Sequence, residues 1–230
     1  MADPVQALLF DIDGTLISTG GASDRAWHRA FAELQGVEVN VPDYTGKGVP
    51  DPEVGLECFQ GALGREPEAD EMAKLMALRQ RYLGEEVASS PGYKVMPGVV
   101  ELLDRLTAEG RLVGLITGNT EPAAHTKLAR ADLNRFFSFG GYGSDSADRG
   151  ELTRKAIERA GEILSSTLDP QRVLVLGDTP NDIAAAHDAG AIGVGVASGH
   201  YGKEELRSAG GDYVLGSLLE ELPGVGEPVP

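Results

Sequence analysis

Apolar residues gather in four short runs along the chain, and each run ends at polar or glycine-rich residues. The runs cover residues Ala7–Phe10, 112–116, 173–176 and Ile192–Val196. They do not alternate with polar residues, which is typical of strands buried on both faces of a parallel sheet. Helical patterns separate the later runs, over Val99–Ala108, 122–131, 151–164 and 182–189. This order predicts an α/β fold with a doubly wound, Rossmann-like parallel sheet.

The stretch from residue 18 to residue 91 interrupts this alternation and predicts consecutive helices over Ala22–Gln35, 52–63 and 69–87. About 70 residues of helix are too many for an ordinary crossover between two strands. We therefore expect a catalytic α/β core at 1–17 and 92–230, with a helical cap at 18–91 inserted over the carboxyl ends of the strands. Glycine-rich segments at 19–21 and 89–92 are the expected hinges.

Composition narrows the classes of partner. The 230 residues carry a net charge of −16, which argues against nucleic acid, because phosphate backbones are bound by Lys and Arg. No apolar run approaches the roughly 18–20 residues of a membrane span. Residues 1–4 lack a basic start, so we expect no secretory signal and a cytoplasmic protein. A single cysteine, Cys58, excludes an intrachain disulfide. The oligomeric state does not follow from these patterns.

Carboxylates follow the first and third runs. Asp11 and Asp13 lie one residue apart at the end of the first run, so an extended chain points both to the same side. Such crowding of like charges is tolerated when a cation or a reacting group lies between them. Asp178 follows the third run, and Gly14 permits a sharp turn close to a ligand. Ligands bind at the carboxyl ends of parallel strands, so these acids predict a site for Mg²⁺ and a phosphoryl group.

Each signal has a structural alternative when taken singly. The Asp11–Asp13 pair could cap a following helix, and Thr117 could be a polar strand terminus. Asp182 could supply negative charge at a helix N-terminus instead of acting in a site. The conjunction of all these groups, each at a strand end, favours a site.

Taken together, the motifs resemble the haloacid dehalogenase superfamily, in its branch of phosphoglycolate phosphatases and β-phosphoglucomutases with a helical cap. The matching segments are Asp11-Ile12-Asp13-Gly14-Thr15-Leu16, Thr117-Gly118-Asn119, and Gly177-Asp178 with Asp182 four residues on. The resemblance implies a phosphoric monoester hydrolase whose nucleophile, Asp11, forms an aspartyl-phosphate.

The resemblance also implies roles for the other residues. Mg²⁺ would be held by Asp11, the backbone carbonyl of Asp13, and Asp178, while the Asp13 side chain acts as general acid and base. Thr117 would donate its hydroxyl to the phosphoryl group, and Asp182 would orient metal-bound waters or the nearby cation. The remaining residues expected at the phosphoryl group are Gly14, Gly118 and Asn119.

The family's third motif, a Lys often followed by Pro, is absent here. Arg149 is the candidate replacement for the cation that binds phosphate and Asp11, with Lys155 and Lys127 as alternatives. An arginine there would differ from lysine, because its planar fork binds two oxygens at once.

The cap is expected to select the substrate. Lys47, in a glycine-rich loop, is the candidate contact to a small phosphorylated metabolite. The predicted function is a Mg²⁺-dependent phosphatase of small phosphate monoesters, of the phosphoglycolate or sugar-phosphate type. The alternatives are a β-phosphoglucomutase-type phosphomutase and a non-catalytic sensor of phosphoryl ligands. The sequence does not identify the physiological substrate.

Overall fold

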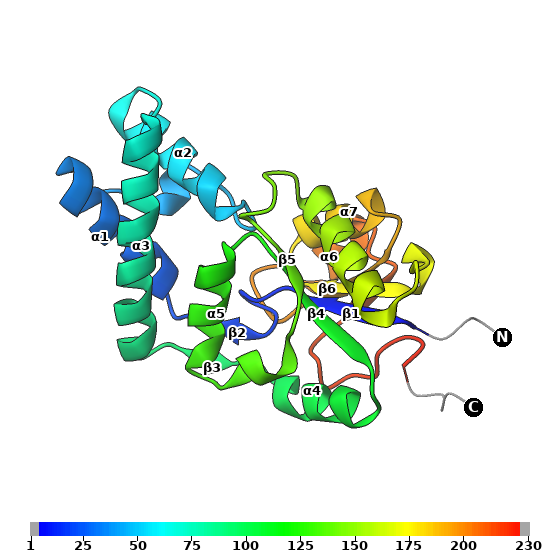
Figure 1. Cartoon of the computed structure of the whole chain (residues 1–230). Coiled ribbons are helices and arrows are strands. Elements are labelled where there is room, and N and C mark those ends of the chain that lie inside the picture. Colours follow the sequence, from blue (N-terminus) through cyan, green and yellow to red (C-terminus); the bar gives the residue numbers. More distant parts are fainter. Residues whose placement is uncertain (1–4, 226–230) are drawn as a thin grey trace.

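Six parallel strands form the central sheet of the computed structural model, which describes residues 5–225 (Figure 1). Their spatial order is β5-β4-β1-β6-β7-β8, and every neighbouring pair is parallel. The predicted doubly wound α/β fold is therefore confirmed. The strands are β1 (Ala7–Phe10), β4 (Leu112–Thr117), β5 (Gly140–Tyr142), β6 (Val173–Gly177), β7 (Ile192–Val196) and β8 (Tyr213–Leu215). Residues 1–4, on which the expected absence of a signal rests, lie outside the described part.

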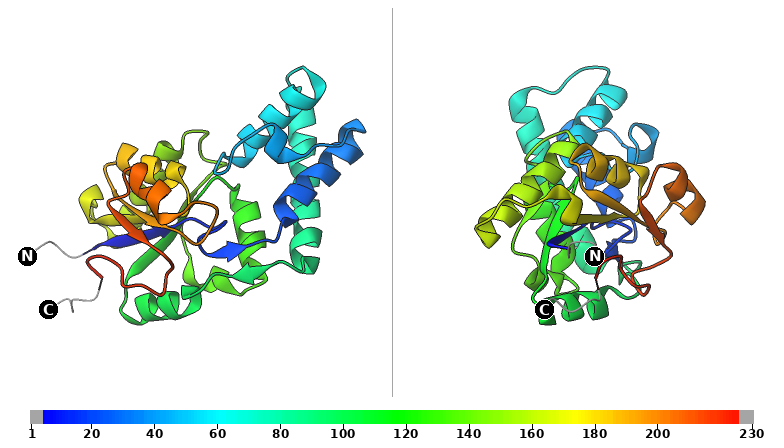
Figure 2. Two further views of the ribbon diagram at one scale, coloured as in Figure 1. Left: turned by 180° about the vertical axis from the view of Figure 1, so that it is seen from behind. Right: turned by 90° about the vertical axis from the view of Figure 1, so that its right-hand side faces the viewer.

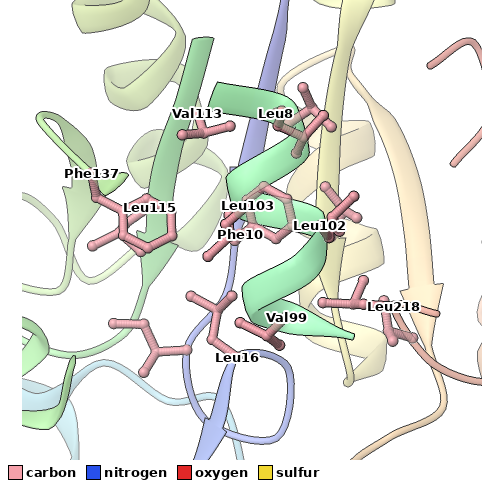
Figure 3. Packing of buried hydrophobic residues seen from close by; sticks show 14 of the residues in the cluster. Leu8, Phe10, Leu16, Val99, Leu102, Leu103, Val113, Leu115, Phe137 and Leu218 are labelled. Atoms are coloured by element: carbon pink, nitrogen blue, oxygen red, sulfur yellow. The ribbon is translucent and has the colours of Figure 1, made fainter. Parts of the chain in front are cut away.

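Helices cover both faces of the sheet, which explains why the strand sequences do not alternate. Leu8 and Phe10 of β1 pack in one cluster with α4 (Val99–Ala108), as Figure 3 shows. Ala7 and Leu9 point to the opposite face and pack in another cluster with residues of α6 (Arg149–Leu164) and α7 (Pro180–Asp188). Every position of β1 is thus buried, and an apolar residue is favoured at each.

The structure adds elements that the hydrophobic pattern does not reveal. Strands β5 and β8 each have only three residues at the two edges of the sheet, too few for a visible period. Helix α8 (Lys203–Ser208) is short and mostly polar. Helix α6 begins at Arg149, two residues before the predicted start, because the Asp148 side chain accepts a hydrogen bond from Glu151 N at 3.0 Å and caps the helix. None of the helices within residues 5–225 is long and apolar enough to cross a bilayer.

Three helices, α1 (Ala22–Gln35), α2 (Asp51–Leu63) and α3 (Ala69–Ser89), lie beyond the carboxyl ends of the strands (Figures 1 and 2). They pack around a hydrophobic cluster of their own, whose largest buried members include Trp27, Phe31 and Phe59. The 3-10 turn η1 (Val41–Asp43) and the loop 45–50 join α1 to α2. We call residues 45–50 the cap loop. The division at residues 18 and 91 stays a prediction.

Two connections join these helices to the sheet, and they run side by side. Strands β2 (Ile17–Ser18) and β3 (Lys94–Val95) pair antiparallel at this junction. Gly20 packs so closely on Gly92 that a Cβ atom at residue 20 would lie 2.4 Å from the Gly92 carbonyl carbon. Helix α5 (Glu121–Ala129) follows β4 and packs against α3, with a hydrogen bond of 2.8 Å from Gln80 Nε2 to Thr126 Oγ1.

Candidate active site

A cavity of about 500 Å³ lies between the strand ends and the cap helices. Its floor contains Asp11, Asp13, Thr117 and Asp178, which follow or end three neighbouring strands. Lys47 of the cap loop lines the cavity from the other side. The topology therefore brings together the acids and the hydroxyl that the sequence places at separate strand ends.

Asp11 lies in the most acidic part of this floor. Its backbone amide donates to Leu176 O at 2.8 Å, which fixes the end of β1 against β6. Carboxylate oxygens of Asp11, Asp178 and Asp182 all lie within 4.8 Å of one another, and all three residues are buried. Burial first, and then the charge of Asp182, raise the pKa of Asp11 well above its usual range, although Arg149 opposes them.

Asp178 has the features of a cation ligand. Its Oδ1 atom is buried and has no hydrogen-bond partner, while burial and the charge of Asp182 raise its pKa to about 7. The carboxylate fits against two glycines: a Cβ atom at Gly14 or Gly199 would lie 2.3 or 1.6 Å from Asp178 Oδ2. A divalent cation would satisfy the orphan oxygen and neutralise the crowded charge, so the residues present fit Mg²⁺.

Arg149 supplies positive charge to this group. Its Nη2 atom forms an ion pair with Asp182 and lies 3.6 Å from Asp11 Oδ1. The Arg149 side chain is only 10% exposed. Asp182 is held in turn, because its Oδ2 atom accepts hydrogen bonds from Thr179 N at 3.0 Å and Thr179 Oγ1 at 2.7 Å in a capping box of α7. Asp182 thus takes part in the cap of α7 and also holds the guanidinium of Arg149.

Asp13 lies in a different setting on the same floor. Its Oδ2 atom accepts hydrogen bonds from Lys127 Nζ at 2.6 Å and from Asn119 Nδ2 at 2.8 Å. Asn119 Nδ2 also donates to Thr117 Oγ1 at 2.7 Å. Burial acts to raise the pKa of Asp13, but the Lys127 ammonium and these hydrogen bonds outweigh it, so the pKa lies below its usual value.

Comparisons with known proteins decide the family. The haloacid dehalogenase-like hydrolase family matches residues 5–190. The chain belongs to this family. It is 28% identical over 228 residues to phosphoglycolate phosphatase of Yersinia pestis, covering 97% of this chain and 94% of the relative. The predicted family and hydrolase class are therefore confirmed, and this curated relative is a phosphatase.

Solved structures of similar proteins share the fold of this haloacid dehalogenase-like hydrolase. A predicted phosphoglycolate phosphatase from Haemophilus somnus superposes with a TM-score of 0.75 at 20% identity, over 95% of this chain and 96% of that one. A β-phosphoglucomutase from Clostridium difficile superposes with a TM-score of 0.72 at 18% identity, over 93% and 92% of the two chains. These likenesses show that the fold is common to both classes of enzyme.

Within this hydrolase, the three candidates for the third-motif cation take different places. Arg149 lies beside Asp11, as described, whereas Lys127 pairs with Asp13. Lys155 lies on the exposed side of α6 and pairs with Glu158 at 2.8 Å, so it is not brought to the cavity. The structure therefore favours Arg149 over Lys155 as the partner of the first acid.

Two of the residues expected at the phosphoryl group already use their backbone amides within the protein. The Gly14 amide donates to Ile17 O at 2.8 Å, so the contribution of Gly14 is the space it leaves for Asp178 at a φ of +90°. The backbone amide of Asn119 donates to Thr117 Oγ1 at 3.2 Å, which orients the Thr117 hydroxyl. Gly118 lines the cavity and accepts a hydrogen bond at its carbonyl from Asp51 N at 2.7 Å.

Sequence reasoning missed other parts of the site. Residues 198–200 line the cavity beyond β7, and Ser198 Oγ donates to Gly14 O at 2.8 Å. The strand-end rule could have found them, since they follow a predicted strand. Buried Asp51 of α2 pairs with Arg79 Nη2 of α3 at 2.8 Å within the cap, and it accepts a hydrogen bond from Thr120 N of the core at 2.9 Å. That contact spans three segments, and no local pattern indicates it.

Proposed function

We propose that this hydrolase cleaves small phosphate monoesters with Asp11 as the nucleophile. The observation that carries the proposal is the placement of two carboxylates at the end of β1, each with its own buried cation: Arg149 for Asp11 and Lys127 for Asp13. A site that only bound a phosphate would gain nothing from the added negative charge of Asp13. The phosphoglycolate phosphatase name of the relatives supports the same conclusion.

In the first step, an Asp11 oxygen attacks phosphorus and the bond from phosphorus to the ester oxygen breaks. The departing alkoxide takes a proton from Asp13 and leaves as an alcohol. Lys127 keeps Asp13 ionised in the ligand-free protein. Asp13 must therefore gain the proton that it later donates, and it gains this proton when the anionic ester binds beside it. A neighbouring negative charge raises the pKa of a carboxyl group and favours that uptake.

In the second step, Asp13 has become a carboxylate again and accepts a proton from an incoming water. The water oxygen attacks phosphorus, the bond to Asp11 breaks, and inorganic phosphate leaves with Asp11 restored. Thr117 and Arg149 would bind phosphoryl oxygens in both steps, because a hydroxyl and a guanidinium donate to developing negative charge. Two carboxylates that follow the end of one strand, two residues apart, can thus serve as nucleophile and as acid and base.

Mg²⁺ would be held by Asp11, the Asp13 backbone carbonyl and Asp178. It would supply the positive charge that allows a carboxylate to approach an anionic phosphate ester. The Asp13 carboxylate pairs with Lys127 and Asn119 through Oδ2 and must also carry a proton in the reaction, so the backbone carbonyl is the atom of Asp13 that would hold the cation.

The cavity favours a small substrate. A volume of about 500 Å³ must hold the phosphoryl group, the cation with its waters, and the alcohol. Lys47 lines it from the cap loop and would attract a second anionic group on that alcohol. Phosphoglycolate, the compound in the relatives' name, has a second anionic group, and it is the first substrate to test.

Release of phosphate from p-nitrophenyl phosphate and from phosphoglycolate tests the proposal. We expect Mg²⁺-dependent turnover of both esters in the wild-type protein and none above background in Asp11→Asn. Turnover that persists in Asp11→Asn would exclude this nucleophile. Conversion of a sugar 1-phosphate to its 6-phosphate without net phosphate release would replace the phosphatase by a mutase.

A further inference from the structure

We propose that Arg149 couples the docking of the cap loop (residues 45–50) to the nucleophile Asp11. The cation beside Asp11 is fully held only when this loop lies on the core. The inference deepens the proposed function and rests on it for the role of Asp11. The contacts that carry it belong to the protein alone.

The coupling follows from the three partners of one guanidinium. Nη1 of Arg149 donates to the backbone carbonyl of Gly48 in the cap loop at 2.8 Å. Nη2 forms the ion pair with Asp182 and lies 3.6 Å from Asp11 Oδ1. A planar and rigid group therefore connects the cap loop, helix α7 and the end of β1. A displacement at one partner moves the donors that face the other two.

Two other hydrogen bonds of the backbone of residues 47–51 hold this segment on the core, beside the bond from Thr120 N to the Asp51 side chain, and none of the three reaches Asp11. Asn181 Nδ2 donates to Lys47 O at 3.0 Å, and Asp51 N, directly after the loop, donates to Gly118 O at 2.7 Å. Gly118 permits the close approach, since a Cβ atom there would lie 2.9 Å from Val49 O and 3.1 Å from Arg149 Nη1. The loop, the guanidinium and the strand end are thus packed against one another.

The same geometry explains why an arginine stands at this position. A lysine ammonium is a single compact charge on a flexible stem and could be drawn to the carboxylates of Asp11 and Asp182. It would have no second nitrogen, fixed in the same plane, for the Gly48 carbonyl. The planar fork adds a bond to the cap loop without giving up the charge at the nucleophile.

The coupling acts in both directions. When the loop lifts, Nη1 loses the Gly48 carbonyl, and the guanidinium is held only by carboxylates on the core. When a phosphoryl group is attached to Asp11, it fixes Arg149 and favours the docked loop, because a coupling free energy between two sites is reciprocal. Lys47, which the loop carries into the cavity, is then held over the reacting group.

Hydrogen exchange of peptides that cover residues 45–51 tests the coupling. In the ligand-free protein, we expect Arg149→Lys to exchange about fivefold faster or more than the wild type, the effect of losing one hydrogen bond. Lys155→Met on the same helix is the matched control and should exchange like the wild type. An Arg149→Lys loop that is as protected as the wild-type loop would overturn the inference.

A second arm adds Mg²⁺ and beryllofluoride, with ¹⁹F NMR to follow binding. We expect bound beryllofluoride to slow exchange of the loop in the wild type and in Asn181→Ala, which loses a loop contact but keeps Arg149. Arg149→Lys should show no such slowing. Equal slowing in Asn181→Ala and Arg149→Lys would contradict coupling through the guanidinium. If the wild type binds no beryllofluoride, the proposed function fails, and the ligand-free comparison still decides whether Arg149 holds the loop.

Discussion

The two sides of the cavity floor shift the pKa values of two neighbouring aspartates in opposite directions. On the Asp11 side, burial and the charges of three carboxylates, foremost that of Asp182, raise the pKa of Asp11, and Arg149 only partly offsets them. On the Asp13 side, a lysine that is 3% exposed approaches to 2.6 Å and holds the pKa of Asp13 below its usual value. The first side is short of positive charge and suits a divalent cation, while the second is already neutralised.

This difference supports the two roles that we propose for Asp11 and Asp13. A carboxylate held among other carboxylates reacts once a cation and a phosphoryl group compensate it. A carboxylate that faces the cavity, with its side chain 41% exposed, can exchange protons with an alcohol or a water. The spacing of two residues makes both possible from one strand end, and the surroundings make the two roles distinct.

The largest expected effect is the loss of the nucleophile. Asp11→Asn should lower kcat for phosphate release by about 10³-fold or more, because the covalent step has no other route. Wild-type protein should become labelled by ³²P from a phosphate ester, and the variant should not. Labelling that survives in the variant would place the nucleophile elsewhere.

The next effect concerns proton transfer. Asp13→Asn should lower kcat by about 10²- to 10⁴-fold, since an amide cannot pass a proton to the alcohol or take one from water. The loss should be smaller for p-nitrophenyl phosphate than for an alkyl ester, because p-nitrophenolate leaves without a proton. Equal losses on the two esters would mean that Asp13 has no acid role.

Lys127 offers a sharper test of the difference between the two sides. Asp13 gives a proton in the first step, so kcat/KM should fall as the pH rises through the pKa of Asp13. Without the charge of Lys127 this pKa should rise, so Lys127→Met should move the basic limb of the pH dependence of kcat/KM upward. We expect a shift of about one pH unit, which represents a tenfold change in kcat/KM at a pH above that limb. Lys155→Met should leave the profile unchanged, and a Lys127→Met profile that matches the wild type would remove Lys127 from this role.

The smallest effect is on stability. The pKa of Asp178 is raised to about 7 in the folded protein, against about 3.9 unfolded, so folding favours its protonated form. The stability linked to that proton is complete below about pH 4 and is lost as the pH rises to about 7. Without metal, the free energy of unfolding should fall by roughly 2–4 kcal/mol over this range on this account. Mg²⁺ at pH 8 should restore it, and Asp178→Asn should flatten the pH dependence.

Much of the floor could be predicted from the sequence, because its residues follow strands that local patterns reveal. Asp11, Thr117 and Asp178 meet because parallel strands end at one edge of the sheet, which is a rule of topology. Lys127 carried a local signal as well: it lies among Ala123, Ala124 and Leu128 on the buried face of α5, where a charged residue needs a partner.

The wall formed by the cap could not be predicted in the same way. The bond from Arg149 to Gly48 joins residues 101 positions apart through a backbone carbonyl, so the identity of the acceptor residue carries no information. The contact of Asp51 with Arg79 and Thr120 depends on how α2 and α3 are placed over the core. Such placement is decided by tertiary packing, and the sequence pattern of each helix shows only which face is apolar.

A crystal structure with Mg²⁺ and beryllofluoride would test the central claim most directly. The account predicts beryllium joined to a carboxylate oxygen of Asp11, with Mg²⁺ contacting Asp178 and the Asp13 carbonyl, and Arg149 and Thr117 donating to the fluorines. Crystals in which the fluoride is bound to Asp13, or in which Asp11 carries nothing and no cation lies beside it, would contradict the account.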